Sequence, residues 1–253
     1  MNFCQITFSP TGGTKKAADA LMQSCCAHRR EIDLCESGAD FSQFRFSRED
    51  LCVVAVPSYG GRVPGPAVRR LSRMRGNGAM AVLVCVYGNR AYEDTLLELK
   101  DTLTAAGFHC IAAVAAVAQH SIVPQFAAGR PDARDMSQLR EFGEKIFTAA
   151  QAGGRRGLSL PGTRPYREYG GTPFKPRGGG ECTRCGMCAK SCSVRAIPME
   201  DPSGVDESAC ISCMRCIGVC PSHAREVSPA ALEAAAQKMK KACSQRKENE
   251  LFL

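Results

Sequence analysis

The chain has 253 residues, of which 44% are hydrophobic and 23% charged, an ordinary globular composition with room for one large domain or for a medium and a small one. It has no run of about 18 apolar residues and does not begin with a basic segment followed by an apolar one. The sequence therefore predicts no membrane span and no signal peptide, and we expect a cytoplasmic protein. The formal net charge is +8, but the basic residues form no stripe with interleaved aromatic residues. This argues against nucleic acid as a partner.

The first 150 residues alternate strand-like and helix-like segments. Short β-branched apolar runs bounded by turn residues are typical of buried parallel strands, and the stretches between them favour helices. The expected strands cover residues 2–8, 51–56 and 81–86, and the expected helices cover residues 14–26, 67–74, 92–105 and 135–150. This alternation predicts an α/β fold with a doubly wound parallel sheet, in which ligands bind at the carboxyl ends of the strands.

The loop after the first expected strand is rich in hydroxyls and glycines: Ser9, Pro10, Thr11, Gly12, Gly13 and Thr14. Such a loop at the start of a helix can direct N–H and O–H groups to a phosphate, although it can equally be a plain helix cap. Neither the Walker pattern nor G-x-G-x-x-G can be fitted to it, so the sequence supports no dinucleotide site.

Ser-Pro-Thr-Gly-Gly-Thr resembles the phosphate loop with which flavodoxins bind FMN, and residues 1–150 are similar to the flavodoxin-like half of ferredoxin-fused flavodoxins of anaerobic bacteria. His120-Ser121 and residues 129–132 also resemble that group. The resemblance implies a sheet of order 2-1-3-4-5 and FMN contacts in the loops after the first, third and fourth strands. The residues it assigns to FMN are Ser9, Thr11, Gly12, Gly13, Thr14, Ser58, Tyr59, Gly60, Gly61, Tyr87, Gly88, Asn89, Arg90 and Tyr92.

Many flavodoxins stack a Trp on the flavin, but this chain has no Trp. Tyr59, Tyr87 and Tyr92 are the candidates to stack in its place, and each is otherwise an ordinary loop aromatic.

Residues 151–181 contain nine Gly and four Pro, and six basic side chains against two acidic ones. No helical or strand periodicity survives there, which predicts a flexible basic linker. The linker divides a domain of residues 1–150 from a cysteine-rich domain of residues 182–228. Residues 229–253 are expected to form a terminal helix that frays toward its end.

The chain has sixteen cysteines, and without a secretory signal they do not predict a disulfide framework. Eight are scattered and are expected to be small buried side chains of a reducing compartment: Cys4, Cys25, Cys26, Cys35, Cys52, Cys85, Cys110 and Cys243. The other eight form two copies of one run: Cys182, Cys185, Cys188 and Cys192, then Cys210, Cys213, Cys216 and Cys220.

The second copy, followed by Pro221, matches the bacterial ferredoxin run C-x2-C-x2-C-x3-C-P, and the first has Ser193 in place of the proline. The duplicated spacing predicts two [4Fe-4S] clusters, and zinc is a weak alternative because its sites pair cysteines at wider separations. In such runs the fourth cysteine serves the other cluster, so Cys192 is expected to join the second run and Cys220 the first. The basic residues around the runs either form a solvated face or stabilise the reduced clusters and attract an acidic partner: Arg184, Lys190, Arg195, Arg215 and Arg225.

The sequence thus predicts an electron-transfer protein that links low-potential one-electron donors to an acceptor through two [4Fe-4S] clusters and FMN. Its partners are redox proteins whose identity the sequence does not give. No catalytic side chain is predicted, because the flavin would carry any chemistry. Two alternatives stand: a flavin-free carrier whose first domain is a docking module, and an FMN-dependent reductase of a small molecule.

Overall fold

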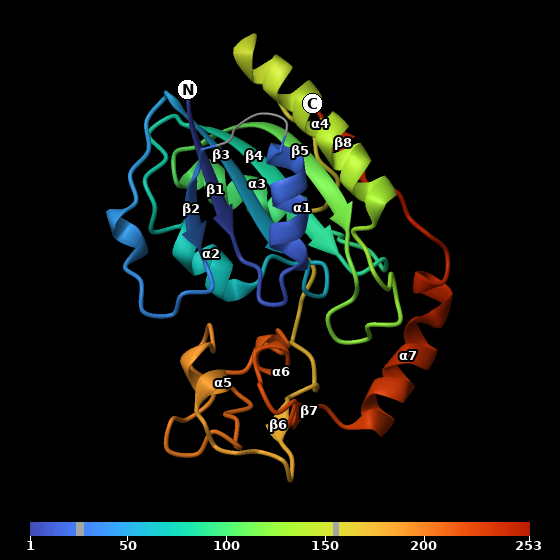
Figure 1. The fold of residues 1–253 in the computed structure, drawn as a ribbon. Coiled ribbons are helices and arrows are strands. Elements are labelled where there is room, and N and C mark those ends of the chain that lie inside the picture. The colour runs from blue at the N-terminus through green and yellow to red at the C-terminus, as the bar shows by residue number, and fades with distance from the viewer. Residues whose placement is uncertain (24–27, 154–156) are drawn as a thin grey trace.

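The computed structural model describes residues 1–23, 28–153 and 157–253. The first part is a sheet between two layers of helices (Figure 1). Its elements are β1 (Asn2–Thr7), α1 (Gly13–Met22), β2 (Arg30–Asp33), a 3-10 helix (Phe41–Gln43), β3 (Asp50–Pro57), α2 (Gly65–Leu71), β4 (Met80–Tyr87), α3 (Thr95–Ala105), β5 (His109–Val117) and α4 (Ala133–Gln151). The elements that follow are β6 (Arg177–Gly178), α5 (Met187–Lys190), α6 (Arg215–Gly218), β7 (Arg225–Glu226), α7 (Pro229–Cys243) and β8 (Glu250–Phe252).

The sheet has the order β2-β1-β3-β4-β5-β8. Its first five strands are parallel, and their order is that of flavodoxin-like doubly wound folds, so the predicted fold class is confirmed. The sixth strand, β8, pairs antiparallel with β5 through Ala113 and Phe252 and through Ala115 and Glu250.

Strand β3 shows why this sequence forms a buried sheet. Leu51, Val53 and Ala55 pack with α1 and α4 in one apolar cluster, while the alternate residues Cys52 and Val54 pack with α2 and α3 in the other. A strand that is apolar on both faces needs a helical layer on each side, and the alternating helices supply them.

Most expected elements match within a few residues, with two points to note. The helix expected from residue 92 begins at Thr95, because Glu93 has φ of +35° and a right-handed helix cannot pass through that conformation. The expected end of the first helix, with Cys25 and Cys26, lies outside the described residues. The other scattered cysteines are buried and free, as predicted: Cys4, Cys35, Cys52, Cys85, Cys110 and Cys243.

The prediction of a flexible linker is wrong for the described part of residues 151–181. Leu158 is 5% exposed, and its carbonyl accepts a hydrogen bond from Lys100. Arg164 donates two hydrogen bonds to Asp101, at 2.8 and 2.6 Å. The segment therefore packs along α3 through specific polar contacts, which composition alone did not reveal.

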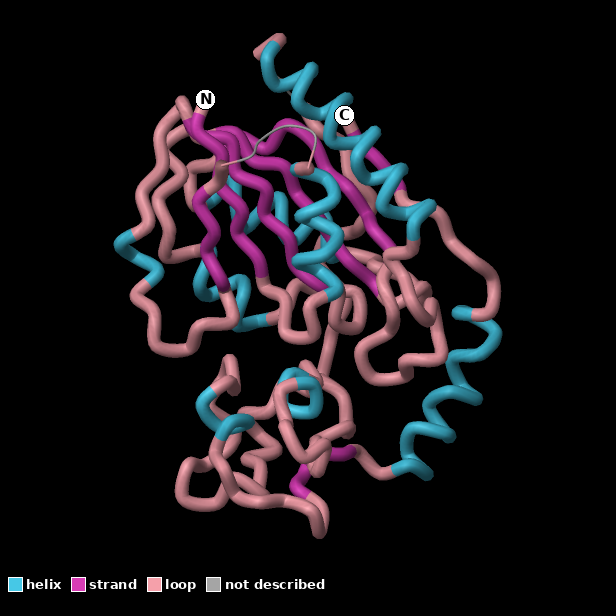
Figure 2. The backbone as a smooth tube through the Cα atoms, viewed as in Figure 1, coloured by secondary structure: helices cyan, strands magenta, loops and turns pink. Residues whose placement is uncertain are grey.

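The prediction of a terminal helix in residues 229–253 is confirmed for α7, but the prediction that its end frays is wrong. Helix α7 ends at Cys243, and the chain then returns to the first domain and adds β8 to the sheet edge (Figure 2). Residues 250–252 thus extend the sheet of the first domain, because they cover the edge that β5 would otherwise leave unpaired.

The cysteine-rich domain lies beneath the carboxyl ends of the parallel strands, where the strand arrows point in Figure 1. Its two short strands, β6 and β7, pair antiparallel, and α7 leads from it along the side of the molecule back to the sheet. Within the described ranges, no helix is both long and apolar enough to span a membrane.

Candidate functional site

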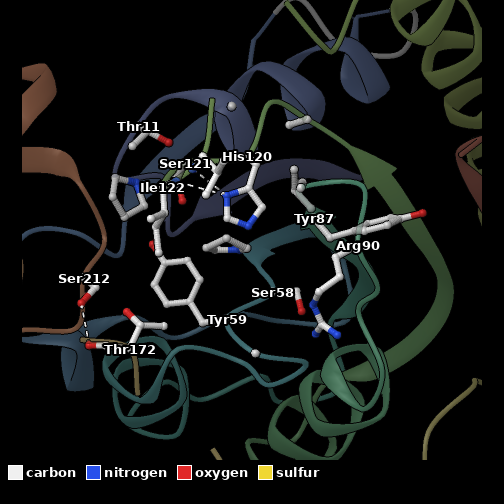
Figure 3. A pocket seen from close by; sticks show the side chains of 18 of the residues that line it. Thr11, Ser58, Tyr59, Tyr87, Arg90, His120, Ser121, Ile122, Thr172 and Ser212 are labelled. Carbon is white, nitrogen blue, oxygen red and sulfur yellow. Dashed lines mark hydrogen bonds between the residues drawn. The ribbon is translucent and has the colours of Figure 1, made fainter. Parts of the chain in front are cut away.

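A cavity opens at the carboxyl ends of the strands, between the sheet and the cysteine-rich domain (Figure 3). Four loops of the first domain, those after β1, β3, β4 and β5, form most of its lining. Of the residues predicted to hold FMN, nine line this cavity: Thr11, Gly13, Thr14, Ser58, Tyr59, Gly60, Tyr87, Gly88 and Arg90. The loops come together because parallel strands bring all their carboxyl ends to one edge of the sheet.

The loop before α1 forms one wall of the cavity, at the start of a helix. Thr11, Gly13 and Thr14 line the wall, and α1 begins at Gly13, so the first helical N–H groups lack partners within the helix. A helix of this kind attracts a phosphate by those N–H groups and by the positive end of its dipole. Ser9 does not line the cavity. Its Oγ accepts the N–H of Lys15 at 2.9 Å and so braces the turn.

Aromatic rings lie on two sides of the cavity. Tyr59 and Tyr87 both line it, as the stacking prediction requires. A third ring, Tyr169, comes from the segment that was expected to be a free linker. Gly60 permits its approach, because a Cβ on Gly60 would lie 2.3 Å from the Tyr169 ring and the backbone has φ of +59°.

Four of the predicted residues serve other purposes or lie beside the cavity. Asn89 is 3% exposed, and it donates to the carbonyls of Cys243 and Gln245, both at 2.8 Å. Tyr92 packs on Tyr87 with ring centroids 5.1 Å apart and bonds Glu250 through its hydroxyl at 3.1 Å. Both residues therefore hold the C-terminal segment. Gly61 is packed against Glu93 and Arg167, and Gly12 lines a neighbouring cleft.

His120 was not predicted as a site residue, but it projects into the cavity from the loop after β5 (Figure 3). Its Nδ1 accepts the N–H groups of Ile122 and Val123 at 3.2 and 3.1 Å, so the neutral ring carries its proton on Nε2. Burial and the neighbouring Arg90 guanidinium lower the pKa of His120 to about 4. The cavity therefore holds a fixed, uncharged donor at neutral pH. Its position directly after a parallel strand was the signal that could have found it.

The described lining of the cavity carries little formal charge. Among the described residues that line it, Arg90 is the only one with a formal charge, and it forms an ion pair with Glu93 at 2.7 Å. Apolar and hydroxyl side chains make up much of the remaining wall. Such a cavity suits a flat, largely apolar ligand with an anionic end.

The cysteine-rich domain closes the cavity on the side opposite the sheet. Ile211 and Ser212, which stand between Cys210 and Cys213, line it, and Met239 of α7 adds to the wall. Ser212 donates to the carbonyl of Thr172 at 3.3 Å, and Lys175 donates to that of Cys210 at 2.5 Å. One cysteine run is therefore in direct contact with the wall of the cavity.

A smaller cavity lies inside the cysteine-rich domain. Its lining brings together the four cysteines that the sequence assigned to one cluster: Cys192, Cys210, Cys213 and Cys216. Val194, Ile197 and Val205 form part of its apolar wall. The first run thus contributes its fourth cysteine to the surroundings of the second run.

The other four cysteines are Cys182, Cys185, Cys188 and Cys220. The backbone N–H of Ala224 donates to Cys220 Sγ at 3.3 Å, and the N–H of Ala196 donates to Cys192 Sγ at the same distance. The two copies of the run therefore share one local geometry. Cys185 is exposed, whereas Cys188 is buried, so this second set reaches the protein surface.

The donors around the cysteines suit a negatively charged cluster. Ser193 Oγ, Arg215 Nε and Arg225 Nε are buried and have no hydrogen-bond partner among the described residues. Buried donors of this kind need an acceptor, and cluster sulfides and thiolates are acceptors. In the described ranges no three Cys, His, Asp or Glu side chains converge on a single point as one metal ion would require. A cubane instead spaces four thiolates around its outside, which agrees with cysteines that line a cavity.

Two comparisons with known proteins found similarities to this chain. Residues 181–224 match the family model described as a 4Fe-4S dicluster domain. None of the curated proteins compared matches the chain. Among solved structures, the flavodoxin of Streptococcus pneumoniae TIGR4 is 19% identical and the match covers 58% of this chain and 98% of that one, with a TM-score of 0.42. An archaeal flavodoxin is 12% identical over 60% of this chain and 99% of that one, with a TM-score of 0.41. Rubredoxin oxygen:oxidoreductase of Desulfovibrio gigas is 17% identical over 60% of this chain and 36% of that one, with a TM-score of 0.43.

The chain thus combines a domain of flavodoxin-like topology with a 4Fe-4S dicluster domain. These two parts support an electron-transfer role for the protein.

Proposed function

We propose that this protein takes single electrons from a low-potential donor into two [4Fe-4S] clusters and delivers them to FMN bound in the cavity between its domains. One observation carries the proposal: Ile211 and Ser212, which separate Cys210 from Cys213, also line the cavity. A cluster held by Cys210 and Cys213 would therefore lie against the wall of the flavin site. No large domain movement is needed to bring the two redox groups together.

The positions of the two cysteine sets support one direction of transfer. The set with Cys192, Cys210, Cys213 and Cys216 lies next to the cavity. The set with Cys182, Cys185, Cys188 and Cys220 includes the exposed Cys185 and is the one that an external donor can approach. Electrons would enter at the exposed cluster and leave at the cluster beside the flavin.

The side chains of the cavity fit the parts of FMN. Thr11, Thr14 and the first N–H groups of α1 would hold the phosphate, and Tyr59 would pack on the ring system. His120 would donate its Nε2–H to a ring acceptor without changing charge near neutral pH. When bound, FMN accepts one or two electrons, whereas each cluster passes one.

The test is a pre-steady-state reduction of the purified, anaerobic protein. Cluster and flavin absorbance are followed after mixing with a limiting one-electron reductant, at several protein concentrations. We expect flavin bleaching to follow cluster reduction with a first-order rate that does not depend on protein concentration. A rate that rises in proportion to protein concentration would instead mean that electrons pass between molecules. If the reconstituted protein binds no FMN, the proposal fails and the alternative function of a flavin-free electron carrier takes its place.

A second candidate function is direct reduction of a small molecule, and one feature favours it. A neighbouring cleft shares Thr11, Gly13 and His120 with the cavity and continues past Lys16 and Arg130. A small acceptor could reach the flavin through this cleft. Reoxidation of the reduced protein by small acceptors without any partner protein would support this function over the relay.

A further inference from the structure

Arg225, the first residue of β7, is a buried cation in the middle of the cysteine-rich domain. It is 2% exposed. Its guanidinium donates to the backbone carbonyls of Pro176, Pro202 and Gly204, and its Nη1 lies 3.7 Å from Cys188 Sγ. Among the described residues no carboxylate lies within ion-pair distance of it, and its Nε has no partner. Burying a cation without a counter-ion is costly, so an anion is expected beside it.

Arg225 lies near cysteines of both predicted clusters. Cys188 belongs to the set with the exposed Cys185, and Arg225 contacts it directly. Cys216 belongs to the set beside the cavity. Arg225 begins β7, and β7 packs against α6, which carries Cys216. The cation therefore stands between the two cluster sites.

The internal repeat shows that the fold does not require an arginine at this position. Arg225 follows Cys220 by five residues, and Ile197 follows Cys192 by the same five. The alanine before each residue donates its N–H to the preceding cysteine at 3.3 Å, so the two positions are structurally equivalent. Ile197 is a 5% exposed apolar residue that lines the cysteine cavity. At this position the first repeat thus has a hydrophobic side chain, Ile197, where the second repeat has Arg225.

We propose that Arg225 sets the reduction potentials of both clusters by stabilising their reduced forms. Each cluster takes up one electron from an external one-electron donor, without a proton, and becomes more negative by one charge. A buried cation beside both clusters favours that change and raises both potentials. The inference rests on the cluster half of the proposed function and is independent of FMN.

The test is a potentiometric titration of the intact, anaerobic protein, followed by electron paramagnetic resonance of the reduced clusters. Arg225→Gln removes the charge but keeps a donor for the backbone carbonyls, and Arg225→Ile copies the residue of the first repeat. We expect both clusters of each variant to become harder to reduce by at least about tenfold in equilibrium constant, which is 59 mV for one electron. Arg225→Lys keeps the charge and is expected to stay closer to the unmodified protein.

Arg184→Gln is the matched control, because Arg184 lies between Cys182 and Cys185 but its side chain is 65% exposed and pairs with Asp201. Solvent screens its charge, so its loss is expected to leave both potentials unchanged. The proposal is overturned if neutral variants with full iron content keep both potentials, or if only one cluster shifts. Failure of both neutral variants to assemble clusters would assign Arg225 a structural role instead. Fewer than about eight iron atoms in the unmodified protein would remove the two-cluster assignment itself.

Discussion

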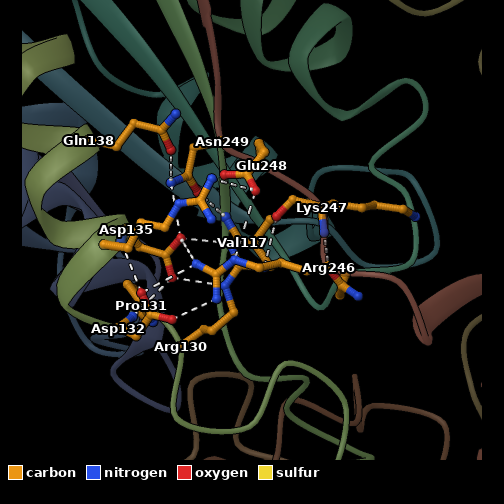
Figure 4. Close-up of polar contacts among 12 residues, drawn as sticks. Val117, Arg130, Pro131, Asp132, Asp135, Gln138, Arg246, Lys247, Glu248 and Asn249 are labelled. Carbon is orange, nitrogen blue, oxygen red and sulfur yellow. Dashed lines mark hydrogen bonds and ion pairs between the residues drawn. The ribbon is translucent and has the colours of Figure 1, made fainter.

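Val117 donates its backbone N–H to the side-chain Oδ1 of Asn249, 2.9 Å away and 132 positions later in the chain. The Asn249 amide in turn donates to Gln138 at 2.7 Å and to Asp135 at 3.3 Å (Figure 4). The C-terminal segment is therefore fixed to the end of β5 and to α4. Because this segment follows the cysteine-rich domain, that domain is tied to the sheet at both of its ends.

Asn249→Ala is expected to lower the free energy of unfolding by about 2–3 kcal/mol. Asn249 is 5% exposed, so its loss leaves the N–H of Val117 buried without an acceptor. Ser244→Ala, at an exposed position of the same segment, is the control and is expected to change stability by less than about 0.5 kcal/mol. Denaturant unfolding followed by circular dichroism measures both, and equal stabilities of the two variants would contradict the clamping role of the segment.

The Arg130–Asp135 pair predicts a pH dependence. Burial alone would raise the pKa of Asp135, but hydrogen bonds and charge from Arg130, at 2.6 Å, outweigh it and lower that pKa below its ordinary value. A carboxyl group with a lowered folded pKa contributes stability above its unfolded pKa of about 3.9, and that contribution is lost as the pH falls through the folded value.

We therefore expect Asp135→Asn to be less stable than the unmodified protein by about 3–5 kcal/mol at pH 7, since it leaves Arg130 buried without its partner. The difference should be constant from pH 8 to 5 and shrink below about pH 4. Denaturant unfolding curves across this pH range measure the difference in stability. Glu141→Gln, which removes the exposed ion pair with Lys145, is the control. A difference that does not depend on pH would mean that the Asp135 charge is not the stabilising feature.

The two cysteine runs predict about eight iron and eight acid-labile sulfide atoms per chain in anaerobic protein. Iron and sulfide analysis after full reconstitution measures this. Four or fewer iron atoms, or stoichiometric zinc in the native protein, would remove the assignment of two clusters.

Crossed ligation predicts how single cysteine variants group. Cys192 lines the same cavity as Cys210, Cys213 and Cys216, so Cys192→Ala should alter the same cluster as Cys213→Ala. Electron paramagnetic resonance of the reduced variants compares these two with Cys185→Ala. If Cys192→Ala instead resembles Cys185→Ala, each run closes its own cluster.

Thr11→Ala combined with Thr14→Ala is expected to weaken FMN binding by at least about tenfold, because both residues line the phosphate end of the cavity. Thr148→Ala, on the exposed side of α4, is the control. Fluorescence titration of flavin-free protein with FMN gives both affinities. An unchanged affinity in the double variant would place the flavin elsewhere.

The sequence by itself determined the fold class and selected the eight cysteines proposed as cluster ligands, because both are local patterns. Alternating apolar strands and helices specify a doubly wound sheet, and cysteines at two-residue gaps can surround a cubane without help from distant residues. The loop before α1 could be proposed as a phosphate site for the same reason, since a helix start and the groups that precede it are adjacent in the chain.

Only the tertiary structure decided which residues meet across the cavity and which hold the chain ends. Tyr169 reaches Gly60 from a segment whose composition indicates a loop, and Asn89 bonds residues more than 150 positions away instead of facing a ligand. Arg225 lies beside Cys188, 37 positions earlier, although no spacing rule connects them. Such contacts depend on the order of the strands in the sheet and on how the two domains pack. The periodicity of a segment shows only which of its faces is buried, and it does not show what lies against that face.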